Sequence, residues 1–181
     1  ESQEFTWWWF GTMRHVFSQP ERFITGTVGE PGERAFYLQL RSASRLFSVA
    51  VEKAQVQAIT ARIDVMVAEI RKSNPLLTIE KLAKDDGPLE SPVDAEFQIG
   101  AMSLAWDEEQ KLICIELYEL EEDEEDAEGE VVEVNIGLGM AAAFSIRSKA
   151  VVNAGRTPCP FCGIPIDPRG HLCPRANGYR R

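Results

Sequence analysis

Apolar and polar residues alternate along several short segments, which is typical of strands that bury one face. A Gly-Glu-Pro-Gly turn at 29–32 separates the first two of these segments. Acidic and amide residues at 107–110 separate two others further along the chain. The pattern predicts strands at 22–28, 34–41, 46–51, 95–106, 111–119 and 130–136.

Two longer segments are predicted to be helices. In the first, apolar residues recur at steps of three and four, which places them on one helical face. These residues are Val56, Ile59, Ile63, Met66 and Ile70. The helix should end at Asn74-Pro75, because a proline disfavours helical backbone in the residue before it. A second helix is predicted at 138–154, with Gly155 as its C-terminal stop.

The order strand–strand–strand–helix therefore occurs twice. Strands joined by hairpins do not form the parallel sheet of a nucleotide-binding fold. We expect an α+β fold, in which a mainly antiparallel sheet carries both long helices on one face. The glycines at 26–29 and 137–139 lack the strand-to-helix spacing of a phosphate-binding loop. Trp106, at the end of a predicted strand, is expected to be a core residue rather than the wall of a pocket.

The composition fits a soluble protein of one domain with a small appendage. The chain has 181 residues, of which 44% are hydrophobic and 27% are charged. No segment approaches the roughly 20 apolar residues of a membrane span, so no membrane contact is expected. Four cysteines are too few for a disulfide scaffold.

Charge is divided unevenly along the chain. Residues 145–181 contain seven basic residues and one acid, a net +6, which leaves −16 for residues 1–144. Ten of the fifteen residues at 119–133 are acidic. This division indicates that the two regions meet different partners, and only the basic tail could attract phosphate.

The tail contains the chemistry that the sequence shows most directly. Five of the ten prolines lie in residues 156–181, which excludes a helix or a central strand there. Cys159, Cys162, His171 and Cys173 have the spacing C-x2-C-x8-H-x-C. Two thiolates two residues apart can bind one Zn²⁺ in a tight turn, and the His and third Cys complete a tetrahedron. We therefore predict one structural Zn²⁺ per chain.

Other interpretations of the cysteines remain open but are weaker. If His171 does not bind, three protein ligands and a water would make a catalytic zinc site. A disulfide would leave one tail cysteine unpaired. A thioredoxin-like redox pair normally precedes a helix, whereas this pair follows one.

The end of the tail is predicted to bind an anion or a partner through Arg175, Tyr179, Arg180 and Arg181. Three functions are compatible with it. The tail could dock a protein partner or the acidic body of its own chain, or it could bind single-stranded nucleic acid. The chain could also be an enzyme or enzyme subunit that acts on a small phosphorylated ligand, held by Arg22, Arg34 and Arg41. No catalytic residues can be assigned, so a non-catalytic interaction module is favoured.

Three regions follow from these patterns. Residues 13–155 should form the α+β domain, and residues 156–181 a zinc-knuckle-like tail. Residues 1–12 include the aromatic run Trp7, Trp8, Trp9 and Phe10, which is either an interface strand or a non-native leader before Met13.

Several segments resemble an actinobacterial family of unknown function, the DUF3090 family. They are PERF at 20–23, GTVG at 26–29, PGER at 31–34, FYLQ at 36–39, LAWD at 104–107, and the ending that runs from CPFC at 159–162 to NGYRR at 177–181. The resemblance covers the chain from Met13 to Arg181. It implies a cytoplasmic protein, agrees with a zinc-type tail, and brings no activity with it.

Overall fold

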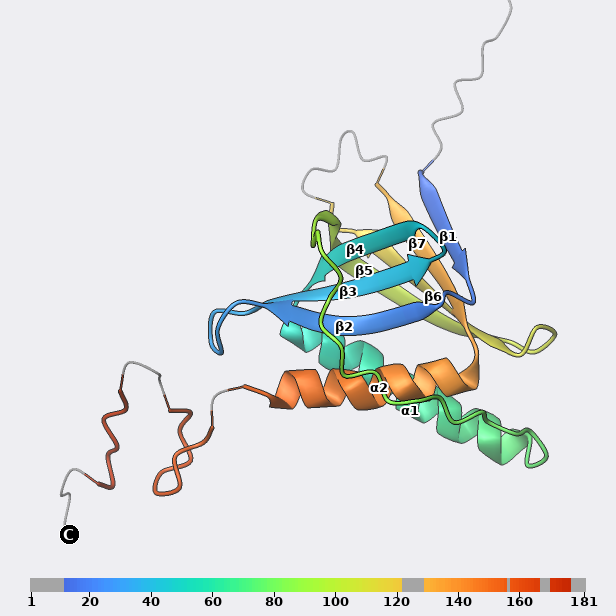
Figure 1. Ribbon diagram of the computed structural model, residues 1–181. Helices are drawn as coiled ribbons and strands as arrows, with labels where there is room; N and C mark the ends of the chain where they lie inside the picture. Colours follow the sequence, from blue (N-terminus) through green and yellow to red (C-terminus); the bar gives the residue numbers. More distant parts are fainter. Residues whose placement is uncertain (1–11, 122–128, 156, 167–169, 177–181) are drawn as a thin grey trace, which may run out of the picture.

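The structure is a computed structural model that describes residues 12–121, 129–155, 157–166 and 170–176 (Figure 1). The aromatic run at 7–10 lies outside the described residues. Among the described residues, no helix is both long enough and apolar enough to cross a membrane.

Both predicted strand–strand–strand–helix units are present. The first consists of β2 (Arg22–Val28), β3 (Ala35–Ser42), β4 (Arg45–Val51) and α1 (Lys53–Ser73). The second consists of β5 (Ala95–Asp107), β6 (Leu112–Glu119), β7 (Val131–Ile136) and α2 (Leu138–Asn153). A short strand that the alternation did not predict, β1 (Arg14–Ser18), precedes them.

The strands form one seven-stranded sheet in the order β1-β7-β6-β5-β4-β3-β2. Four of its six neighbouring pairs are antiparallel, while β1–β7 and β4–β5 are parallel. A parallel pair needs a crossover connection, which α1 and the segment after it supply between β4 and β5. The sheet is thus mixed but mainly antiparallel, and the α+β class is confirmed.

The sheet curls so that strands far apart in its order meet. The rings of Phe17 on β1 and Phe47 on β4 lie 5.6 Å apart, and Phe47 lies 6.2 Å from Phe97 on β5. The two helices lie side by side on one side of this curled sheet (Figure 1). Phe144 of α2 stacks on Phe23 of β2 with ring centroids 4.3 Å apart, which joins the helical layer to the sheet.

The predicted apolar face of α1 is its buried face. Its buried residues are Val56, Ile59, Thr60, Ile63, Met66 and Ile70. A capping box at Glu52 begins the helix, because the Gln55 side chain accepts a hydrogen bond from the Glu52 backbone N–H. The helix ends with its C-cap at Asn74, as the Asn-Pro pair predicts.

The segment between α1 and β5, residues 74–94, forms a strap across the body. Arg22 binds Asp85 of the strap through two hydrogen bonds of 2.6 and 2.9 Å. A side chain at Gly26 would overlap Leu89, and one at Gly139 would overlap the Glu80 carbonyl group. One glycine of each pattern, Gly26 at 26–29 and Gly139 at 137–139, therefore allows the strap to approach the body closely.

Candidate metal centre

A tight turn brings Cys159 and Cys162 together. The Gly163 N–H donates to the Cys159 carbonyl at 2.8 Å, and the Cys159 N–H donates to the Ile164 carbonyl at 2.8 Å. Gly163 has φ of +75°, a conformation that L side chains disfavour and glycine tolerates. A bridge between Pro158 and Pro165 continues this narrow hairpin. The local sequence thus builds half of the site without help from the sheet.

His171 and Cys173 complete the group. The four ligand atoms of Cys159, Cys162, His171 and Cys173 lie within 4.8 Å of one another. The Sγ atoms of Cys159 and Cys173 are 3.8 Å apart, and Cys162 Sγ lies 3.2 Å from His171 Nε2. Tetrahedral zinc implies about 3.8 Å between two sulfur ligands and about 3.6 Å between sulfur and nitrogen. The spacing therefore suits a small tetrahedral ion, and the cysteines are free thiols.

The surroundings favour thiolate at one position. The pKa of Cys159 is lowered to about 6, mainly because the Phe161 backbone N–H donates a hydrogen bond to it. Burial raises the pKa of Cys162. Cys159 and Cys173 are both buried, each with 6% of its surface exposed. Since the thiolate is the metal-binding form, the surroundings of Cys159 favour a metal ligand at this position.

Of the four residues predicted to bind an anion or partner, only Arg175 lies in the described part of the chain. Its Nη1 donates to the Phe161 carbonyl at 3.1 Å, so the guanidinium lies against the Cys159–Cys162 turn. This position puts a positive charge beside a thiolate-rich group. Tyr179, Arg180 and Arg181 lie outside the described residues.

The arginines proposed for a phosphorylated ligand all contact groups of the body. Arg22 pairs with Asp85, and Arg41 pairs with Glu21 and Glu90. Arg34 donates to the Val151 carbonyl of α2 at 3.2 Å and lies over the Phe36 ring. Arg22 and Arg41 are cross-strand partners on β2 and β3, but Arg34 precedes the opposite end of β3, so the three do not surround one ligand position.

Sequence reasoning missed the outward-facing apolar side chains around the metal group. Phe161 is 64% exposed and Leu172 is 86% exposed, and Ile164 is about half exposed. Their exposure could have been predicted from their positions between the metal-binding residues. A turn that directs its cysteines inward must direct the residues between them outward. The described tail continues beyond the end of α2, away from the sheet (Figure 1).

Fold and site together define an α+β protein with a C-terminal Cys3His group able to hold a metal ion. The model of the family described as "Protein of unknown function (DUF3090)" matches residues 15–173. The chain belongs to this family, and the match includes all four ligand residues. No curated protein and no solved structure matches the chain.

Proposed function

We propose that this is a zinc protein whose metal orders the tail as a non-catalytic interaction module. The observation that supports the proposal is the Cys3His group, in which four protein side chains supply four ligand atoms. Four nitrogen and sulfur ligands are typical of structural zinc, whereas catalytic zinc keeps one position for water or substrate. The donor set also favours zinc over calcium or magnesium, which prefer oxygen.

The charge of the site agrees with this assignment. Three thiolates, a neutral imidazole and Zn²⁺ sum to −1, and the Arg175 guanidinium lies against the same turn. Thiolates persist where cysteines are kept reduced, so we place the protein in the cytoplasm.

The exposed side chains support an interaction role for the tail. Phe161 and Leu172 are held outward by the residues that would bind the metal, and Arg175 adds a cation beside them. Apolar groups fixed at a surface, with a charge nearby, are typical of protein-docking sites. A protein partner, including another copy of the chain, therefore fits the tail better than a small substrate does.

Metal content tests the zinc assignment. Purified full-length protein should contain about one zinc per chain. Cys173→Ser should lose most of it, and Co²⁺ loaded in place of zinc should give the visible absorption of a tetrahedral thiolate site. Cys114→Ser, in β6 and outside the group, is the matched control and should keep its zinc. Zinc-free protein with an ordered tail would contradict the proposal.

Single-stranded nucleic acid remains the alternative ligand of the tail. The acidic body opposes such binding at long range, and a short basic tail supplies few phosphate contacts. Titration of labelled single-stranded RNA and DNA at two salt concentrations separates the alternatives. Salt-sensitive binding that is lost when residues 156–181 are removed would favour nucleic acid over protein docking.

A further inference from the structure

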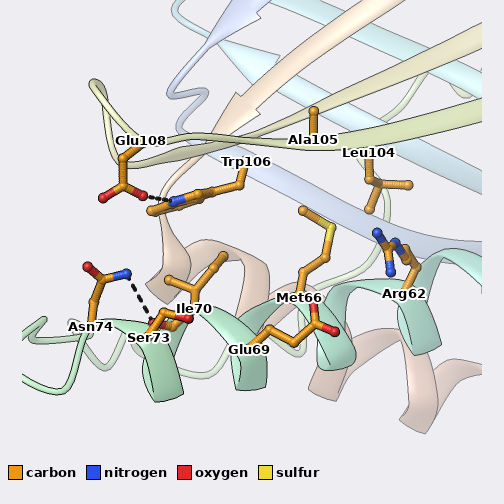
Figure 2. A pocket seen from close by; sticks show the side chains of 10 residues that line it. All are labelled: Arg62, Met66, Glu69, Ile70, Ser73, Asn74, Leu104, Ala105, Trp106 and Glu108. Carbon is orange, nitrogen blue, oxygen red and sulfur yellow. Dashed lines mark hydrogen bonds between the residues drawn. The ribbon is translucent and has the colours of Figure 1, made fainter.

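A groove lies between the C-terminal half of α1 and the end of β5, with a volume of about 320 Å³ (Figure 2). Its floor is apolar, because Met66 and Ile70 of α1 face Leu104 and Trp106 of β5 across it. Trp106 was expected to be a core residue, but it is only partly buried and forms a wall of the groove.

Carboxylates lie along the rim of the groove. The Trp106 indole N–H donates to Glu108 Oε2 at 2.5 Å, which fixes both side chains at one end. Glu69 is exposed on α1 at the opposite wall. Arg62, further along α1, is the one basic side chain that lines the groove. The Glu108 carboxylate already pairs with Lys111. An apolar group with an adjacent cation fits this arrangement, since the ring face of Trp106 and the Glu69 carboxylate attract a positive charge.

We propose that the groove receives the metal-ordered tail of a second copy of this chain. The tail offers the complementary chemistry: exposed Phe161 and Leu172 for the floor, and Arg175 for Glu69 and the Trp106 ring. The charge division of the sequence acts in the same direction, because residues 156–181 carry a net +4 and residues 1–155 a net −14. The inference rests on the proposed function, since the metal is what fixes these side chains outward.

The same chain's tail is poorly placed to reach this groove. Asp64 of α1 binds Ser145 and Lys149 of α2, while Gln57 and Asn153 line one cavity between the helices. The helices are therefore antiparallel, and the tail leaves α2 beside the N-terminal part of α1. The α1-side lining of the groove runs from Arg62 to Asn74, which is about 8 to 26 Å further along α1 than Gln57 at 1.5 Å per residue.

The linker limits the same chain's tail to the nearer part of the groove. The hairpin of the metal group begins at Pro158, and α2 ends at Asn153. Five residues reach at most about 17 Å when fully extended. Docking within one chain would need a stretched linker lying back along both helices, whereas the tail continues away from them (Figure 1). A second copy meets no such restriction, and two copies can exchange tails around a two-fold axis.

Sedimentation velocity of the zinc-loaded full chain over a range of concentrations tests the inference. We expect a reversible dimer that dissociates when the metal is chelated. Leu172→Ser in the tail and Glu69→Arg at the groove should each raise the dimer dissociation constant tenfold or more. Both side chains are exposed, so neither change should disturb folding. Ile146→Ser is the matched control, because Ile146 is 64% exposed on α2 and does not line the groove.

A mixture of the two variants identifies the contact as one between chains. A mixed dimer retains one unaltered tail in one unaltered groove, so it should be tighter than either variant's own dimer. A monomer at all concentrations, or a dimer unaffected by both variants, would overturn the inference. If that monomer still holds one zinc, the zinc assignment stands and only the docking fails. If the chain binds no zinc at all, the proposed function fails with it.

Discussion

Replacing Gly139 with alanine tests whether the strap explains the second glycine pattern. Gly139 lies in the first turn of α2. An added Cβ would lie 3.3 Å from the Glu80 carbonyl carbon, closer still to its oxygen, and 3.6 Å from Leu82 Cγ. Because the nearest atoms belong to backbone, a side-chain rotation cannot relieve the overlap. Arg147 resists movement of the strap, since its Nη1 donates to the Asp85 carbonyl at 2.7 Å.

Two effects of opposite sign determine the result. Alanine in place of glycine stabilises a helix by up to about 1 kcal/mol. Forcing packed atoms apart costs about 1–3 kcal/mol. The second effect should win, so we expect a net loss of about 1–2 kcal/mol in the free energy of unfolding. For a chain of this size, that loss lowers Tm by about 2–8 °C.

Urea unfolding of the full chain, followed by circular dichroism, measures the change. The midpoint should fall while the slope with urea stays the same. Ala150→Gly, at an exposed position of α2, is the control for helix propensity and should cost about 1 kcal/mol. Gly139→Ala and Ala150→Gly are opposite exchanges on α2, and both should lower the free energy of unfolding. A stabilised Gly139→Ala protein would refute the close approach of the strap.

Three further predictions concern the metal group and the strap. Gly163→Ala should weaken zinc binding about 5- to 30-fold by competition titration, because an L residue at φ of +75° costs about 1–2 kcal/mol. In dilute protein, where the chain is monomeric, chelation should expose the Arg175–Ala176 bond to trypsin and leave the Tm of the body unchanged, because the hydrophobic core runs only from Phe17 to Val152. Asp85→Asn should destabilise the chain at pH 7, since hydrogen bonds from Arg22 lower the pKa of Asp85. Because the pKa of Asp85 is lower in the folded chain than its unfolded value near 3.9, the ionised carboxylate stabilises the folded state at pH 7. The difference in unfolding free energy between the two proteins should therefore shrink as pH falls below about 4. A difference that stays constant with pH would contradict the prediction.

Alternation of apolar and polar residues was sufficient to order most of the fold. It works best for β5, β6 and β7, which largely bury alternate side chains, whereas β2, β3 and β4 each bury three or four consecutive residues at their centres. It failed for β1, which has five residues and one fully buried side chain, Phe17. The partner of β1 is β7, more than a hundred residues away in the sequence, and the two pair in parallel. A long-range pairing of this kind leaves no local signal in a short segment.

The metal group has a local signal in the sequence, whereas the groove has none. The four ligands were predictable because their spacing is local and a tight turn assembles half of them. The groove forms where α1 packs beside β5, two elements separated in the chain by residues 74–94, so no single segment of sequence contains it. Trp106 shows the difference clearly: an apolar residue at a strand end is normally buried, and here the neighbouring helix leaves its ring partly open.

The position of the apolar side chains in the tail argues against a purely stabilising role. If the metal group only capped α2, Phe161 and Leu172 would gain most by packing on the body. They are instead 64% and 86% exposed, and Cys159 and Cys173 are the buried apolar members of the described tail. The body has a complete core without them, extending from Phe17 to Val152. The proposed metal would fix an exposed apolar surface and add nothing to the core of the body, which favours a partner that covers that surface.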